Sequence, residues 1–209
     1  MKFDSYKYSA RKYDLFVEPF NRTLRKMAIS VYPPKEGMRV LDVGCGTGTT
    51  LSLYHKVGCI VSGLDSSPAM LKEAEKKLKD QAELLLGDAS EMEYSEKFFD
   101  LVVGMFTLHE IHPNIRSKVL KEMIRVLKPE GRILLIDYHP GLIRFPKGWR
   151  YRAVIYFFEI AAGRKHFKNF RDFLNNKGIP GLIAREKLTI EKNKVVGGGN
   201  LGIYLLKKE

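Results

Sequence analysis

The sequence is poor in the features that mark cross-linked, metal-clustered and membrane-spanning proteins. Only two of its 209 residues are cysteines, Cys45 and Cys59, which excludes a disulfide scaffold and favours a reducing compartment. No cysteine cluster with zinc-ligand spacing is present, and we expect no metal. The longest apolar run of the C-terminal third, Ala153 to Phe158, is far shorter than the roughly 20 residues of a membrane-spanning helix, and the chain starts without the apolar core of a signal peptide. We therefore expect a cytoplasmic protein.

Acidic residues are also scarce, and the two signs of charge are unevenly distributed. The 24 Asp and Glu residues face 36 Lys and Arg residues, which gives a net charge of +12. Residues 37–139 carry a net charge of −2, whereas residues 1–36 carry +4 and residues 140–209 carry +10. The excess positive charge therefore lies on the parts that flank a nearly neutral centre. It either makes the surface soluble or attracts nucleic acid, anionic lipid or an acidic small molecule.

No repeat, low-complexity tract or linker divides the chain, and its middle alternates β-rich runs with helical patterns. The expected strands are residues 38–43, 59–64, 82–86, 98–105 and 132–138, and the expected helices are residues 47–57, 68–78 and 115–127. We expect residues 128–131 to form the turn before the fifth strand. This order of elements requires parallel strands joined by right-handed crossovers, which is a doubly wound α/β sandwich.

The two ends of the chain show further patterns. Residues 9–31 carry the apolar stripe of one amphipathic helix, or of two helices broken near Pro19. Two β-rich runs, Gly181–Ile190 and Leu201–Leu206, flank three consecutive glycines and predict an antiparallel hairpin at the sheet edge. The predicted fold is therefore a mostly parallel seven-stranded sheet with a C-terminal hairpin.

A glycine-rich loop follows the first expected strand, where α/β folds bind their ligands. Gly44, Gly46 and Gly48 permit a tight turn and close approach of a ligand to the backbone. The spacing is not that of a dinucleotide site, because Thr49 stands where the third small residue is expected, and no P-loop lysine follows. Asp65 ends the second strand and can accept hydrogen bonds from both ribose hydroxyls, which indicates a nucleoside.

Five sequence elements between residues 38 and 138 carry a family resemblance. They are Val40–Gly48, Gly63–Leu71, Gly87–Ala89, Phe99–Val103 and Val126–Arg132, in order and at the expected intervals. In these elements the chain resembles the class I S-adenosylmethionine-dependent methyltransferases. The resemblance implies a Rossmann-like fold, S-adenosylmethionine as the cofactor, and methyl transfer that requires no metal.

The resemblance also implies positions for the cofactor. It places Asp42 and the loop residues Gly44, Cys45, Gly46 and Gly48 at the methionine moiety, Asp65 at the ribose, Ser66 and Met70 around the adenine, Asp88 and Ala89 at the adenine edge, and Met105 and Phe106 on the acceptor side. These assignments are expectations that follow from the resemblance.

Two segments bear on the methyl acceptor and on catalysis. The stretch Gly104–Pro113 lacks the Asp/Asn-Pro-Pro-aromatic pattern of enzymes that methylate amino groups of nucleobases, which makes a nucleic-acid substrate unlikely. Within it, His109 is either a catalytic residue on the acceptor side or a residue of a structural turn. Residues 8–14 resemble the lid helix of the ubiquinone/menaquinone-biosynthesis and bacterial phospholipid N-methyltransferases, and this resemblance implies that Tyr13 lies near the sulfonium.

Residues 139–178 depart from that resemblance. They interleave aromatic and basic side chains in what reads as a helix pair, with His166 as a candidate to face the pocket. This helical cap either roofs the acceptor pocket, contacts an anionic membrane surface as a peripheral protein, or covers the sheet edge. The acceptor itself therefore does not follow from the resemblance.

We interpret residues 1–209 as one methyltransferase domain. Its parts are an N-terminal lid helix at 1–36, a cofactor-binding core at 37–138, a helical acceptor cap at 139–178 and a closing hairpin at 179–209. The leading hypothesis is methyl transfer to a small or lipid-like acceptor at N, O or C, with Glu110, His109 and His139 as candidate bases if carbon is methylated. The alternatives are an RNA-directed methyltransferase, whose RNA binding must weaken steeply with salt, and a cofactor-binding module without turnover.

Overall fold

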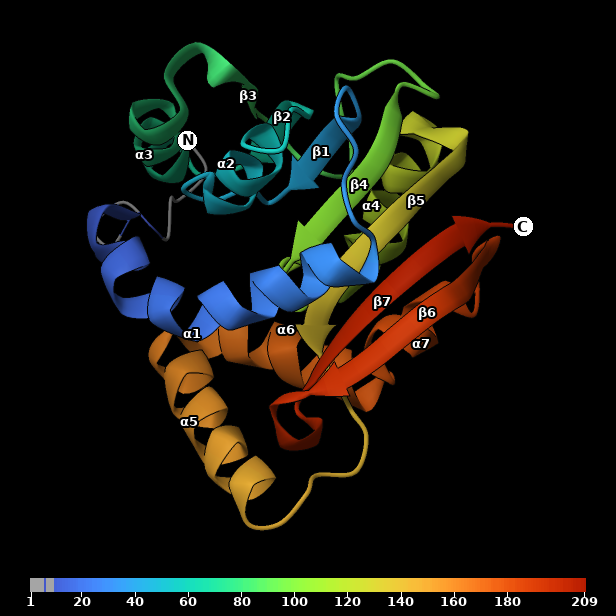
Figure 1. Ribbon diagram of the computed structural model, residues 1–209. Helices are drawn as coiled ribbons and strands as arrows, with labels where there is room; N and C mark the ends of the chain where they lie inside the picture. Colours follow the sequence, from blue (N-terminus) through green and yellow to red (C-terminus); the bar gives the residue numbers. More distant parts are fainter. Residues whose placement is uncertain (1–5, 7–9) are drawn as a thin grey trace.

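The computed structural model contains one mixed seven-stranded sheet (Figure 1). It describes residue 6 and residues 10–209, apart from the side chains of residues 12, 13, 16, 17 and 20. The strands are β1 (Arg39–Val43), β2 (Ile60–Asp65), β3 (Ala82–Leu86), β4 (Phe99–Met105), β5 (Leu127–Tyr138), β6 (Leu188–Val196) and β7 (Leu201–Lys208). Their order is β3-β2-β1-β4-β5-β7-β6, and only β7 pairs antiparallel with its neighbours. The predicted sheet with its antiparallel hairpin is confirmed.

Helices cover both faces of this sheet. The helices are α1 (Ala10–Val31), α2 (Thr49–His55), α3 (Pro68–Leu78), α4 (Pro113–Val126), α5 (Lys147–Ala161), α6 (Arg164–Asn175) and α7 (Gly178–Ile183), with short 3-10 turns at Lys79–Gln81 and Gly197–Gly199. Side chains from α1, α2 and α3 share one buried cluster, and those from α4, α6 and α7 share the other. Helix α5 lies beside α6 at the margin of the molecule (Figure 1).

The inner strands are apolar on both sides because each side packs against helices. In β5, Ile133 and Leu135 belong to the cluster under α4, whereas Leu134 and Ile136 belong to the cluster under α1. All four side chains are fully or almost fully buried. This two-sided burial fixes the register of the sheet, and with it the position of the loops at the strand ends.

Several element boundaries match the prediction, and their local causes are visible. Helix α3 begins at Pro68, which has no N–H to leave unpaired, and the Ser67 side chain accepts a hydrogen bond from the backbone N of Met70. Helix α1 is continuous through Pro19. Pro19 and Leu15 are both exposed, so water can satisfy the carbonyl of residue 15 that Pro19 cannot bond.

Two predicted elements are wrong. Residues 128–131 do not form a separate turn, because β5 already starts at Leu127 and takes up these residues in a bulge, with Phe99 paired to Leu127 and Leu101 to Arg132. The strand predicted at Gly181–Ile190 starts only at Leu188. Its first part, up to Ile183, belongs to α7, whose Ile179 and Ile183 are four residues apart and pack in the core as helix positions do, and residues 184–187 form a turn. The closing segment is therefore a helix followed by the hairpin.

Candidate active site

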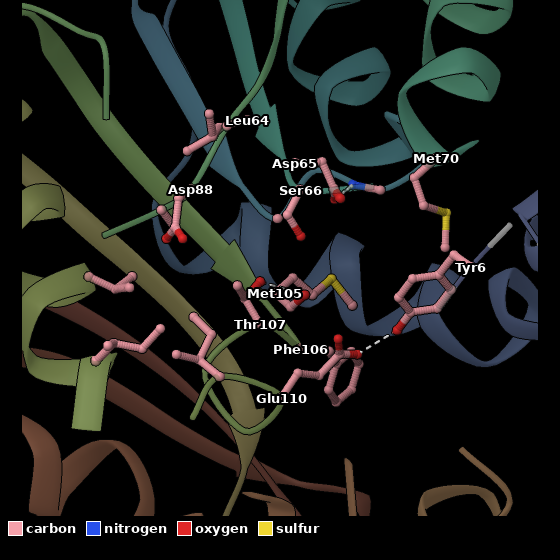
Figure 2. Close-up of a pocket in the computed structure, with 17 residues that line it drawn as sticks. Tyr6, Leu64, Asp65, Ser66, Met70, Asp88, Met105, Phe106, Thr107 and Glu110 are labelled. Atoms are coloured by element: carbon pink, nitrogen blue, oxygen red, sulfur yellow. Dashed lines mark hydrogen bonds between the residues drawn. The ribbon is translucent and has the colours of Figure 1, made fainter. Parts of the chain in front are cut away.

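A cavity of about 310 Å³ opens at the carboxyl ends of β1, β2 and β4. This is the position where parallel α/β sheets bind ligands, and the volume falls in the ordinary range for small-molecule pockets. Figure 2 shows the side chains that line it. They are Tyr6, Gly44, Gly46, Leu64, Asp65, Ser66, Met70, Gly87, Asp88, Ala89, Met105, Phe106, Thr107, Glu110, Ile111, Ile115 and Val119.

The glycine loop brings its backbone to the cavity wall. Gly44, Gly46 and Gly48 have φ angles of 75°, 54° and 75°, in the left-handed region that favours glycine. A Cβ on Gly44 would lie 2.6 Å from the Thr107 hydroxyl oxygen, and one on Gly48 would lie 2.7 Å from a Leu78 methyl group. A Cβ on Gly46 would meet nothing within 4 Å. Gly46 is therefore where a ligand can approach the backbone most closely.

Two carboxylates stand at one end of the cavity. Asp65 accepts hydrogen bonds at 2.8 Å from the backbone N of Gly46 and of Ser67, one on each carboxylate oxygen. Oδ1 of Asp88 accepts hydrogen bonds at 2.9 Å from the backbone N and the hydroxyl of Ser90. These hydrogen bonds orient both carboxylates at the cavity wall, and each carboxylate is an acceptor-only group with several lone pairs. This pair suits the hydroxyls and amino group of a nucleoside.

Asp42 lies on β1 and is not part of the cavity wall. It is 2% exposed, and its Oδ1 has no hydrogen-bond partner among the described residues. Burial, only partly opposed by Arg25, raises the pKa of Asp42 to about 7. Because Asp42 lies behind the glycine loop and not in the cavity wall, it can act on a bound ligand only through its charge, which would attract a cation. Together with Asp65 and Asp88, this suits a nucleoside that carries positive charge, such as S-adenosylmethionine.

Helix α1 is tied to the glycine loop by its Asp14. The two Asp14 carboxylate oxygens contact the hydroxyl of Thr47 and the ammonium of Lys77, and Lys77 also contacts the Thr49 hydroxyl. Further along α1, Arg25 donates a 3.0 Å hydrogen bond to the hydroxyl of Thr50 in α2. These contacts hold α1 against the N-terminal end of α2, in the place expected for a lid.

The other end of the cavity holds one polar pair among apolar side chains. The Tyr6 hydroxyl donates a 2.7 Å hydrogen bond to Oε1 of Glu110, and both lie with Phe106 away from Asp65 and Asp88 (Figure 2). Burial raises the pKa of Glu110, although His109 and His166 oppose this shift. Phe106 has a positive φ of 56°, a strained backbone of the kind found at functional sites.

His109 is buried behind this wall and does not line the cavity. Its Nδ1 lies 2.7 Å from Oδ1 of Asp137, whose Oδ2 accepts hydrogen bonds from the backbone N of Leu108 and of His109. Although burial favours the neutral ring, the Asp137 carboxylate raises the pKa of His109 to about 9. Arg116 braces the same loop by donating from Nε to the carbonyls of Leu108 and Ile111.

The structure brings together most, but not all, of the predicted site residues. Nine of them line the cavity: Gly44, Gly46, Asp65, Ser66, Met70, Asp88, Ala89, Met105 and Phe106. Asp42, Cys45, Gly48 and His109 do not line it. The side chain of Tyr13 lies outside the described residues. The binding and catalytic roles of all these residues stay predictions.

Sequence reasoning missed part of the cavity wall beside Glu110. Thr107 directly follows Met105 and Phe106, and its position one residue beyond them is the signal that could have found it. Ile115 and Val119 lie within the predicted helix 115–127, and the first turns of α4 also face the cavity. Tyr6 lies outside any periodic pattern, so the sequence held no signal for it.

Comparison with known proteins agrees with this geometry. A family model described as a methyltransferase domain matches residues 40–131. The demethylmenaquinone methyltransferase of Bacillus subtilis (strain 168) is 33% identical over 195 residues, which cover 86% of this chain and 81% of that enzyme. That of Renibacterium salmoninarum is 34% identical over 136 residues, which cover 63% of this chain and only 56% of the enzyme.

A solved structure extends the likeness to the whole fold. The 1,6-didemethyltoxoflavin-N1-methyltransferase of Burkholderia thailandensis, solved with its substrate and S-adenosylhomocysteine bound, has a TM-score of 0.67 at 16% identity, over 98% of this chain and 84% of that one. At this identity the likeness concerns the fold alone. Together with the matched family model and the Bacillus relative, the site shows that this chain belongs to the class I S-adenosylmethionine-dependent methyltransferases, with S-adenosylmethionine as its cofactor.

Proposed function

We propose that this enzyme methylates a quinone-type aromatic acceptor that bears a hydroxyl group and an apolar substituent. The observation that carries the proposal is the composition of the acceptor end, where Glu110 and Tyr6 form one polar pair among Met105, Phe106 and Ile111. One hydroxyl on a flat apolar ring matches such a wall. The demethylmenaquinone methyltransferases among the relatives support the same class of acceptor.

In this proposal the opposite end of the cavity binds the cofactor. Asp65 accepts hydrogen bonds from the ribose, and Asp88 with Ala89, Ser66 and Met70 surrounds the adenine. The glycine loop lies along the methionine moiety, with its closest approach at Gly46, and the Asp42 carboxylate beneath it attracts the positive charge. When bound, S-adenosylmethionine supplies a methyl group already activated by its sulfonium.

The residues of the chain then have to orient the acceptor, hold its proton and exclude water. Phe106 and Met105 pack against the ring, and alignment of this kind supplies about 7–11 kcal/mol in favourable cases. Oε2 of Glu110 takes the hydroxyl proton, which makes the ring more nucleophilic, while the Tyr6 hydroxyl holds Oε1 in place. Helix α1, tied by Asp14 to Thr47 and Lys77, holds the glycine loop in place beside the cavity.

A product assay tests this function. Purified enzyme with methyl-labelled S-adenosylmethionine is offered a short-chain demethylated hydroquinone, an amine-headed phospholipid and a structured RNA, and products are identified by mass spectrometry. We expect methylation of the hydroquinone only. Glu110→Gln should lower kcat by about 100-fold or more while leaving cofactor affinity unchanged, and Glu91→Gln, whose side chain is 74% exposed, is the matched control.

Other products would contradict the proposal in distinct ways. Methylated RNA, with binding that weakens steeply as salt rises, would favour the RNA-directed alternative. Tight cofactor binding with no product from any acceptor would favour a binding module without turnover. Asp65→Ala should abolish cofactor binding in every case, so retention of binding in that variant would refute the cofactor assignment itself.

The outer face of α5 supports a second proposal, contact with an anionic membrane. We define this α5 face as its large exposed apolar side chains and those of the preceding loop: Leu142, Phe145, Trp149, Tyr151, Val154, Phe157, Phe158 and Ile160, which are 47% to 95% exposed. Residues 140–171 contain eight basic residues and one acidic residue, Glu159, which is buried. An apolar face bordered by basic side chains is complementary to anionic lipid. No helix in the described part of the chain is long and apolar enough to cross a bilayer.

Vesicle co-sedimentation tests this contact. We expect binding to vesicles that contain phosphatidylglycerol and much weaker binding to pure phosphatidylcholine vesicles, with loss of binding at high salt. The double substitution Trp149→Ser and Phe157→Ser should abolish binding, whereas Val57→Ser, an exposed apolar position in a distant turn, should not. Equal binding by both variants would refute the role of the α5 face.

A further inference from the structure

A cluster of three potential metal ligands lies behind the acceptor end of the cavity, and we propose that His109, Glu159 and His166 bind a divalent transition-metal ion. The three residues come from the loop after β4, from α5 and from α6. Nε2 of His109 lies 3.7 Å from Oε1 of Glu159, and Nε2 of His166 lies 2.8 Å from Oε2 of Glu159. The three ligand atoms all lie within 4.8 Å of one another.

These distances suit a shared ion. Metal–nitrogen and metal–oxygen bonds of 2.0–2.2 Å in a tetrahedral site place ligand atoms about 3.3 Å apart. The observed separations of the ligand atoms lie on both sides of that value. Side-chain movements of about 1 Å would therefore bring all three atoms within bonding distance of one ion. Oε2 of Glu159 has Nε2 of His166 as a close partner at 2.8 Å. A metal ion that replaced the proton between these two atoms would bind both of them.

Helix α5 turns a carboxylate into the protein and leaves most of its apolar side chains outside. Its buried residues are Gly148 and Glu159, whereas Ile155 and Tyr156 are half-buried and six large apolar side chains are exposed. An ionised carboxylate is costly to bury unless it is paired or coordinates a metal, and Glu159 is paired with His109, His166 and Tyr138. A metal ion held by this group would give the orientation of the helix a function.

His109 is also oriented as a metal ligand is. Its Nδ1 is engaged at 2.7 Å by the Asp137 carboxylate, and Nε2, which must release its proton when an ion binds, is directed towards Glu159. Metal-bound histidines commonly donate their other ring N–H to a carboxylate, which fixes the tautomer. The Tyr138 hydroxyl donates a 2.7 Å hydrogen bond to Oε1 of Glu159 and orients that ligand in turn. The cluster therefore has both the ligands and the residues that position them.

The ligand types identify the class of ion. Two imidazoles and one carboxylate favour Zn²⁺, Co²⁺ or Fe²⁺ over Mg²⁺ and Ca²⁺, which prefer oxygen ligands. Three protein ligands leave at least one coordination position open. Glu110, which lines the cavity, interacts electrostatically with all three ligands, so the ion would lie directly behind the acceptor wall. The expectation from the sequence that no metal is present would then be wrong.

Metal titration of the untagged, chelator-treated protein tests the site. We expect one Zn²⁺ or Co²⁺ per chain by calorimetry, with visible Co²⁺ absorption bands of a four- or five-coordinate site and a rise of Tm with metal concentration. Glu159→Gln and His166→Ala should each weaken binding at least ~100-fold. Asp137→Asn should weaken it about 10- to 100-fold, as the loss of a carboxylate behind a ligating histidine does.

His55→Ala is the matched control, because it removes an imidazole elsewhere and should leave the affinity unchanged. Wild-type protein that binds no more tightly than Glu159→Gln, or Co²⁺ bands that survive in both ligand variants, would overturn the proposal. Folding of each variant is checked by its binding of S-adenosylhomocysteine. Because the readout is metal binding and not methyl transfer, the result is independent of the proposed acceptor.

Discussion

Replacement of Asp42 by asparagine should stabilise the protein in the absence of ligand, increasingly so as the pH rises. The Asp42 carboxyl is buried, has one oxygen without a hydrogen-bond partner in the described part of the chain, and has a pKa raised from 3.8 to about 7. A group whose pKa is higher in the folded state contributes its full stability below its unfolded-state pKa. That contribution is lost as the pH rises to the folded-state value. Asparagine has a similar shape and does not titrate, so it avoids this loss.

The magnitude follows from the size of the pKa shift. Between pH 4 and pH 7 the free energy of unfolding of Asp42→Asn, relative to wild type, should rise by about 1.4 kcal/mol per pH unit and then level off. The total gain is about 4 kcal/mol. Urea unfolding followed by circular dichroism at several pH values, without S-adenosylmethionine, measures this difference. Titrating groups that do not interact with Asp42 contribute equally to both proteins and cancel.

Asp100→Asn supplies the opposite control. Hydrogen bonds from Lys128 and from the backbone of Arg39 lower the pKa of Asp100 despite partial burial. Its replacement should therefore destabilise the protein at neutral pH, and the difference from wild type should shrink in acid. A pH-independent difference for Asp42→Asn would refute the reasoning, because it would show that the carboxyl titrates normally in the folded protein.

Three further predictions concern the glycine loop, helix α1 and the core. Gly46→Ala should cost about 1 kcal/mol of stability because of the positive φ. It should also weaken cofactor binding more than 10-fold, as measured by equilibrium dialysis. Gly37→Ala, also at positive φ and with open space around its Cβ, should show only the stability cost. Asp14→Ala should raise the KM for S-adenosylmethionine several-fold with less than ~1 kcal/mol lost in thermal unfolding, because its contacts are partly exposed. Phe173→Ala, 2% exposed and stacked under Arg116, should cost about 3–5 kcal/mol, and a loss below ~1 kcal/mol would contradict its place in the core.

The end of the cavity that holds Asp65 and Asp88 could be predicted from the sequence because its signals are local. Ser67 and Pro68 fix the start of α3 within a few residues, and the glycine loop is a backbone requirement visible as Gly44, Gly46 and Gly48. Asp65 and Asp88 both end strands, and parallel strands bring their carboxyl ends to one edge whatever the rest of the chain does. The glycine loop and the two strand-end carboxylates can therefore be placed at one edge of the sheet from their local sequence patterns.

The end of the cavity that holds Glu110 and Tyr6 depends on contacts that are distant in the sequence. Glu110 meets Tyr6 across 104 positions, and His109 meets Glu159 across 50, so no spacing rule links them. The sequence left open whether residues 139–178 roof the pocket, contact a membrane or cover the sheet edge, and its apolar pattern gave no sign that α5 buries Glu159. Orientation about a helix axis is decided by such polar contacts, which apolar periodicity does not record.

The placement of β7 has a consequence for synthesis of the protein. The last strand in chain order lies between β5 and β6, and its residues from Gly202 to Leu206 are buried. While the ribosome is still adding these residues, the nascent chain presents an open edge on β5 and an unmatched β6. The domain therefore matures only after release of this segment, and until then chaperones have an exposed strand edge to protect.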